Sequence, residues 1–127
     1  GGCLAIVKKL AGAAGTATFF AEACDDVVPT TSPYVGGYWY RYSTATDVFS
    51  AWTLVSVATG TIVTAGADAI WEFYVPATAL MGGSNQYNYK YCRVSLVEID
   101  STAVDGTMVV MLVDPRVAQS IPATVLA

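Results

Sequence analysis

Carboxylates that occur in pairs are the first side chains in this sequence whose types and spacing could support chemistry. Asp25 and Asp26 are adjacent, and Glu98 and Asp100 share one face of a strand because side chains alternate along a strand. Two carboxylates on one face are typical of glycosidases and of calcium sites. Asp25 and Asp26 lie in a turn-rich stretch, and Glu98 and Asp100 lie where a strand meets a loop. We therefore interpret both pairs as solvated turn carboxylates.

Histidine is absent from the sequence, which removes His-based triads, His metal sites and the commonest general base. The three cysteines, Cys3, Cys24 and Cys92, have neither an even count nor C-x-x-C spacing, so they indicate neither a zinc site nor a complete disulfide framework. They fit small buried apolar residues, and a Cys3–Cys24 bridge stays open if the first two strands pair. We expect no catalytic residue, no metal, no cofactor and no enzyme activity.

Aromatic side chains are the densest chemical feature, and the cluster comprises Tyr34, Tyr38, Trp39, Tyr40, Tyr42, Trp52, Trp71 and Tyr74. Flat rings stack on sugar faces, so this cluster offers a carbohydrate-binding groove as one hypothesis. Alternation from Tyr38 to Tyr42 places the tyrosines on one face and Trp39 with Arg41 on the other. That pattern favours a strand that packs Trp39 inward or into a partner subunit, since aromatic residues are enriched in cores and interfaces.

Two arginines stand within apolar strands and need carboxylate partners. Arg41 follows the Tyr-Trp-Tyr run, and Arg93 follows Cys92. A guanidinium in such a position requires an acidic side chain from the same chain or across an interface. The candidate partners are Glu98, Asp100, Glu72 and Asp47.

Composition limits the possible partners. The 127 residues suit one domain, and only 13% are charged where about 25% is usual, so much of the surface must be neutral or apolar. Such surfaces usually face another molecule. The net charge of -4 and the six Lys and Arg residues argue against nucleic acid. The apolar N-terminal stretch is interrupted by Lys8 and Lys9, so we predict neither a transmembrane helix nor a signal peptide.

The stretch from Tyr87 to Val113 is expected to organise the fold. In its first half Tyr87, Tyr89 and Tyr91 recur at every second position and give way to Cys92, Val94 and Leu96. Its Asp105-Gly106 pair suits a tight turn, and Thr107 to Val113 carries no charge. This pattern predicts two long antiparallel strands, the second buried on both faces. Further strands are expected at 38–42, 48–57, 61–63 and 70–75, with an extended loop over 25–33 and a loop or helical turn over 77–85.

The ends of the chain are predicted less sharply. Residues 16–23 favour a strand, whereas a single helix over 3–24 is the competing interpretation because of its alanines. Pro122 restricts 117–127 to an edge strand or an arm. We predict one all-β domain, a jelly-roll-like antiparallel β-sandwich. Its parts are an N-terminal segment or arm (1–33), a sandwich core (34–115) and a C-terminal edge strand or arm (116–127).

Several motifs between Phe49 and Val113 carry a resemblance to a known family. They are a strand that ends in Pro76, the Tyr-x-Arg-hydrophobic run from Tyr91 to Val94, and Gly106-Thr107 before an apolar closing strand. This order resembles the small β-sandwich decoration, or cement, proteins of tailed-bacteriophage capsids. The resemblance implies a homo-oligomer on the surface of the capsid, assembled in the host cytoplasm. Its partners would be further copies of itself and a capsid shell protein.

The expected function is therefore structural. The residues expected at the subunit or shell interface are Tyr38, Trp39, Tyr40, Arg41, Tyr87, Tyr89, Arg93 and Arg116. A carbohydrate-binding sandwich that uses the aromatic cluster on a glycan is the alternative from another functional class. Within the structural hypothesis, a decoration protein, a main shell subunit and a tail or fibre component stay open.

Overall fold

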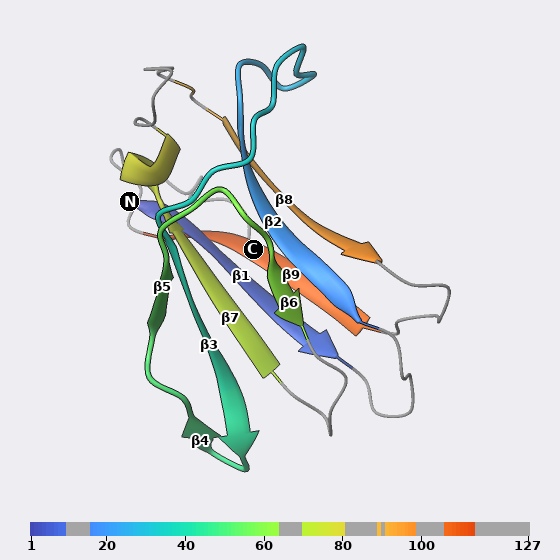
Figure 1. Cartoon of the computed structure of the whole chain (residues 1–127), viewed down its shortest axis with the longest axis vertical. Helices are drawn as coiled ribbons and strands as arrows, with labels where there is room; N and C mark the ends of the chain where they lie inside the picture. Colours follow the sequence, from blue (N-terminus) through green and yellow to red (C-terminus); the bar gives the residue numbers. More distant parts are fainter. Residues whose placement is uncertain (10–15, 64–69, 81–88, 90, 99–105, 114–127) are drawn as a thin grey trace, which may run out of the picture.

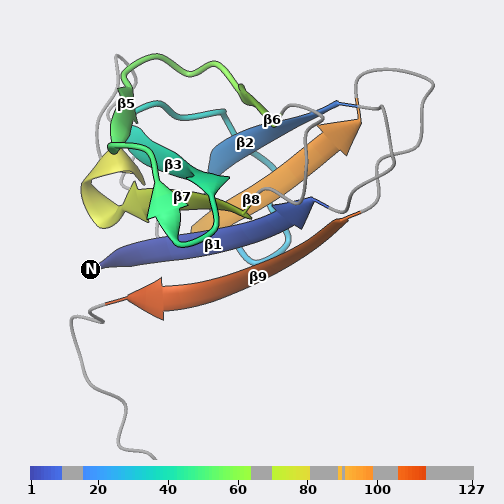
Figure 2. The same ribbon diagram turned by 90° about the horizontal axis from the view of Figure 1, so that it is seen from below.

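The computed structural model describes residues 1–9, 16–63, 70–80, 89, 91–98 and 106–113. Over these residues the protein is an all-β, antiparallel β-sandwich, as predicted. The jelly-roll arrangement itself stays a prediction. Figures 1 and 2 show the two layers, one formed by a six-stranded sheet and the other by a three-stranded sheet.

The six-stranded sheet, called the large sheet below, has the order β4-β3-β7-β1-β9, with β5 also paired to β3. Its strands are β1 (Gly2–Lys9), β3 (Tyr38–Ala45), β4 (Val48–Phe49), β5 (Thr53–Val55), β7 (Ile70–Pro76) and β9 (Gly106–Val113). The small sheet has the order β6-β2-β8 and contains β2 (Ala17–Cys24), β6 (Thr61–Val63) and β8 (Tyr91–Glu98). A 3-10 helix, η1 (Ala77–Leu80), follows β7, where a loop or helical turn was predicted.

Period-two alternation decides which face of the large sheet enters the core. Cys3, Ala5 and Val7 of β1 are buried, and so are Trp71, Phe73 and Val75 of β7. The residues between them point to the opposite face of the sheet. The register confirms the layering, because Ala5 lies directly opposite Phe73.

The core joins the two sheets through aromatic rings. Phe19 of β2 stacks on Phe73 of β7 with ring centroids 3.8 Å apart, and its ring meets Tyr38 of β3 edge-on at 5.6 Å. All three side chains are fully buried. Aromatic pairs of this kind add about 0.5–1.5 kcal/mol beyond the burial of their area, so this trio holds the layers together.

The N-terminal segment is not an arm. β1 lies between β7 and β9 in the large sheet, and β2 lies between β6 and β8 in the small sheet. The strand interpretation of residues 16–23 is confirmed, whereas the helix over 3–24 is wrong. β1 and β2 also belong to different sheets, and Cys3 and Cys24 are free thiols, so the bridge between them is wrong as well. These two strands are central to the sandwich that was predicted to begin at residue 34.

The predicted pairing of the two strands within residues 87–113 with each other is also wrong. β8 pairs with β2 in the small sheet, and β9 pairs with β1 in the large sheet. β9 is not buried on both faces but lies at the edge of its sheet with exposed apolar side chains. Asp105 lies outside the described residues, as do Tyr87 and the C-terminal segment predicted as an edge strand or arm.

The predicted strand over 48–57 is divided. β4 forms a hairpin with β3 through Thr46 and Asp47, and Asp47 adopts a positive φ of 59°, which Asp tolerates better than most residues. β5 then returns along β3, so that Leu54 lies opposite Trp39. Both short strands occupy the same margin of the large sheet.

Candidate functional site

One row of side chains crosses the outer face of the large sheet, the face turned away from the small sheet. Paired positions run across β5, β3, β7, β1 and β9, and the members of this apolar row are Leu54, Trp39, Tyr74, Leu4 and Met111. Every member is apolar or aromatic. Strands spaced about 4.8 Å apart make such a row about 19 Å long.

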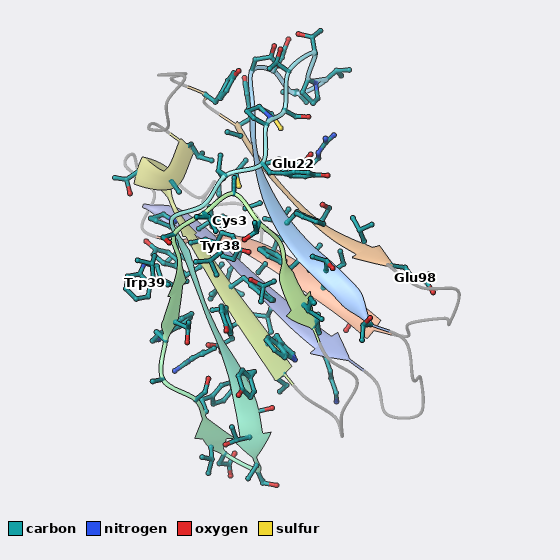
Figure 3. The ribbon with its side chains drawn as sticks, in the orientation of Figure 1. Cys3, Glu22, Tyr38, Trp39 and Glu98 are labelled. Atoms are coloured by element: carbon teal, nitrogen blue, oxygen red, sulfur yellow. The ribbon has the colours of Figure 1, made fainter. Side chains whose placement is uncertain are left out.

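The apolar row is open to solvent. Trp39 retains 38% of its surface and Leu54 retains 47%, and none of the described strands nor η1 lies over them. Figure 3 shows the contrast along β3, because Tyr38 points between the sheets while Trp39 points away from them. The large sheet is therefore apolar on both faces and covered by the described chain on only one.

A shallow pocket opens at one end of the row. It is lined by Trp39, Trp52 and Tyr74 and has a volume of about 320 Å³. The rings come from β3, from the segment before β5 and from β7. These three aromatic side chains were part of the predicted cluster, whereas Tyr38 and Trp71 of the same cluster lie in the core.

A single ion pair interrupts the apolar character of this part of the face. Arg41 lies opposite Glu72, and its Nε donates a hydrogen bond to the carboxylate of Glu72. The Arg41 guanidinium also lies 4.6 Å from the ring centroid of Phe49 and 4.7 Å from that of Trp52. Glu72 was one of the four candidate partners named for the two arginines, and the structure pairs it with Arg41. The pair neutralises its own charge and shares its cation with two rings.

The second arginine has a partner that was not among the candidates. Nε and Nη2 of Arg93 donate hydrogen bonds to the carboxylate of Glu22, at 2.5 and 3.0 Å. Glu22 lies on β2 directly opposite Arg93 on β8. Its side chain is buried in a strand whose other residues are mostly apolar. The hydrogen bonds to Glu22 raise the pKa of Arg93. Since Nη2 of Arg93 also reaches Ser32 at 3.2 Å, this contact fastens the 25–33 loop to the small sheet.

The interface residues predicted from the sequence fall into different environments. Tyr38 is fully buried, and its hydroxyl donates to the Thr59 carbonyl at 3.0 Å and lies 2.8 Å from Oγ1 of Thr61. Its placement at an interface is therefore wrong. Tyr40 is half-buried and stacks on Trp71, so it too belongs to the inner side of β3. Of the four residues of β3 that were predicted at the interface, only Trp39 and Arg41 belong to the outer face.

Of the remaining predicted positions, the structure describes two, Arg93 and Tyr89. Arg93 occupies the small sheet beside Glu22, and Tyr89 is half-buried before β8. Tyr87 and Arg116 lie outside the described residues. Sequence reasoning missed Leu4, Leu54 and Met111, although the alternation of Leu4 with buried Cys3 and Ala5 was a usable signal once β1 is known to be a strand.

The carboxylate pairs show turn chemistry where the structure describes them. The Asp25 carboxylate accepts hydrogen bonds from the backbone N–H groups of Thr30 and Thr31 and from Oγ1 of Thr30. The Thr30 hydroxyl is the main reason why the pKa of Asp25 lies below its ordinary value. Glu98 is exposed at the end of β8, and Asp100 lies outside the described residues. Asp25 therefore stabilises a loop.

The cysteines are free thiols in the interior. Cys3 and Cys24 are buried and Cys92 is half-buried. The contact with Cys3 is the main cause that raises the pKa of Cys92, and burial adds to it. Burial also raises the pKa of Cys24. Both shifts favour the neutral thiol at neutral pH, which suits small apolar core residues.

Within the described part of the chain, no group of three or more His, Cys, Asp or Glu residues is placed to hold a metal ion. Over the same residues, the protein contains no helix whose length and apolar character would let it span a bilayer. Comparisons with family models, with curated proteins and with solved structures gave no match for this chain.

Proposed function

We propose that the protein is a structural subunit of a homo-oligomeric assembly and that it decorates the capsid of a tailed bacteriophage. The observation that carries the proposal is the apolar row on the outer face of the large sheet. The capsid location rests on the resemblance of Phe49 to Val113 to capsid decoration proteins. In this proposal the row is covered by another copy of the chain and by the shell protein.

The physical argument begins with the exposed apolar area. Burial of a Val, Leu, Phe or Met side chain stabilises by about 1.5–3 kcal/mol relative to leaving it in water. Trp39, Leu54 and Met111 are each more than a third exposed, so covering them gives association a substantial favourable term. An apolar sheet face is usually covered by another layer of protein, and the outer face of the large sheet lacks such a layer within the described residues.

Charge on this face does not oppose the proposal. Arg41 and Glu72 are already paired, and Arg41 lies against two rings. A charge that enters an interface together with its partner avoids the large penalty of an unpaired buried ion. Around the Arg41–Glu72 pair the outer face therefore accepts an apolar partner without a new counter-charge. Lys8, which alternation places on the same face, is exposed near the end of β1.

The test compares two matched variants. Leu54→Lys places a charge in the apolar row, and Ile62→Lys places the same charge on β6 of the small sheet, where the side chain is similarly exposed. We expect sedimentation to show a multimer of the 13.3 kDa chain that Leu54→Lys weakens and Ile62→Lys leaves intact. A wild-type protein that stays monomeric at high micromolar concentration would contradict the proposal. Binding to shells that lack their decoration protein then tests the capsid role.

A second candidate function is supported by the pocket of Trp39, Trp52 and Tyr74. Three rings around about 320 Å³ suit the apolar face of a sugar ring, and the neighbouring Arg41–Glu72 pair supplies polar groups. A glycan array tests this function. A hit that Trp52→Ala abolishes would favour carbohydrate binding, whereas an array without hits would favour the structural role.

A further inference from the structure

β9 is an open sheet edge. All eight of its residues, from Gly106 to Val113, pair with β1 on one side, and no described strand pairs with the other side. Its side chains are exposed on both faces of the sheet: Val109 and Met111 lie on the outer face, and Val110 and Leu112 on the inner face. The exposed fractions reach 58% for Val109 and 80% for Leu112.

The other described edges are protected. β4 has two residues and a register shift between Ser43 and Ala45, and β5 and β6 have three residues each. β8 is long but carries the charged Arg93. Short length, irregular register and charge are the usual means by which proteins prevent strand addition. Of the edges that the structure describes, β9 alone has full length, regular pairing and no charge.

We propose that β9 of one subunit pairs in antiparallel orientation with β9 of a second copy, so that the large sheet continues across a two-fold axis. This inference rests on the proposed oligomeric function and specifies one of its contacts. Eight residues correspond to a paired length of about 27 Å. The unpaired backbone groups of β9 would then obtain partners, which an apolar contact alone does not supply.

The sequence of β9 favours a second copy as the occupant. Around a two-fold axis the strand meets itself, and its run from Met108 to Val113 places apolar side chains opposite apolar side chains in every central register. A foreign strand would need the same uncharged pattern. A second copy always supplies it, because isologous contacts present the same patch from both sides.

The charge beside one end of β9 favours the antiparallel orientation. The exposed Lys8 on β1 lies opposite Thr107, near the start of β9. An antiparallel pair sets the two copies of Lys8 at opposite ends of the paired strands, whereas a parallel pair would set these like charges at the same end.

The two-fold axis also extends the apolar row. In an antiparallel strand pair this axis is perpendicular to the sheet, so both outer faces point the same way. Met111, the last member of the row, lies on β9 itself. The rows of the two subunits therefore become parts of one apolar surface, which a third layer can cover.

The experiment uses a matched pair of valines on the two long edges. Val109→Lys charges the open edge at β9, and Val97→Lys charges β8, where the side chain is also exposed. Leu112→Lys, at the most exposed of the large apolar residues of β9, repeats the test on the inner face. Circular dichroism and thermal melting establish that each variant folds. Sedimentation then gives the assembly mass, and hydrogen exchange reports the protection of the β9 amides.

We expect Val109→Lys and Leu112→Lys to reduce the assembly mass at least two-fold and to expose the β9 amides, while Val97→Lys retains the wild-type behaviour. If the β9 variants keep the wild-type mass, the strand pairing is overturned while the oligomeric function stands. If the wild-type protein is itself monomeric, the strand pairing and the oligomeric function are both overturned. If the wild-type assembly has unprotected β9 amides, the contact lies elsewhere and the pairing is likewise overturned.

Discussion

Tyr38→Phe is the substitution that separates a core role from an interface role most sharply. Tyr38 was predicted at an interface but is fully buried, and its hydroxyl connects β3 to the segment that leads into β6. The substitution keeps the ring, which packs against Phe19 and Phe73, and removes only the hydroxyl. A loss of stability would therefore come from the hydrogen bonds alone.

The magnitude follows from the two groups that lose their partner. Oγ1 of Thr61 belongs to a half-buried residue, and the carbonyl belongs to Thr59, an exposed residue whose oxygen can bond water instead. A buried polar group left without a partner costs about 1–3 kcal/mol, and partial access to water reduces this. We expect the free energy of unfolding to fall by about 1–2 kcal/mol. For a domain of this size that corresponds to a decrease in Tm of about 4–8 °C.

Denaturant unfolding at low protein concentration is the assay, with Tyr42→Phe as the control because Tyr42 is partly exposed. Thr61→Ala should show a similar loss, and the double variant should lose less than the sum because both substitutions remove one contact. An unchanged stability combined with a weaker assembly would refute the core assignment and return Tyr38 to the interface.

The same residue has a pH signature. Burial raises the pKa of Tyr38 above its ordinary value of 10.0, and the hydrogen bond with Thr61 opposes this. A raised pKa means that the associated stability is present below pH 10 and is lost as pH rises through the folded-state pKa. The stability difference between wild type and Tyr38→Phe should therefore shrink above about pH 10, since phenylalanine has no proton to lose.

Three further predictions concern the fold. Gly36→Ala should destabilise by about 1–3 kcal/mol in denaturant unfolding, because a Cβ there would lie 2.6 Å from the backbone carbon of Val57; an unchanged midpoint would mean that this approach is wrong. The buried thiols of Cys3 and Cys24 should resist iodoacetamide in the native protein at neutral pH and react on unfolding, as measured by mass spectrometry; rapid native labelling of these two would contradict their burial. Thr30→Val should raise the pKa of Asp25 toward 3.8 in an NMR titration. The loop stabilisation that depends on Asp25 should be present above about pH 4 and be lost as pH falls through the lower folded-state pKa. An Asp25 pKa that Thr30→Val leaves unchanged would contradict this.

Local alternation made much of the fold predictable. It separated Trp39 and Arg41 from the tyrosines of β3. Glu72, one of the candidate partners named from the sequence, lies opposite Arg41 in the register. Alternation does not tell which face is inside. The inner face of β3 is the one that meets Phe19, a residue distant in sequence, so the direction of Trp39 was not accessible from β3 alone.

The pairing of strands was the part of the fold that the sequence predicted least well. β8 and β9 are neighbours in the sequence, and the Asp-Gly pair between them suggested a hairpin, yet each pairs with an N-terminal strand in a different sheet. β2 in turn contains three alanines among its eight residues, and the low β-propensity of alanine obscured its central position. These pairings depend on contacts between the ends of the chain, which no local pattern records.

The uncharged sequence of β9 was also interpreted wrongly. The absence of charge from Thr107 to Val113 indicated burial on both faces, and the structure shows an exposed edge instead. Both interpretations share one physical premise, that this strand avoids water. None of the described strands covers the free side of β9, and the partner strand that we propose would satisfy that premise.

Hydroxyl-radical footprinting of the assembled and the diluted protein tests the proposed interface most directly. If the outer face of the large sheet is covered, Trp39, Leu54 and Met111 should lose reactivity in the assembled protein, while Ile62 on the small sheet keeps its reactivity. The account is contradicted if the residues of the apolar row react equally in both states.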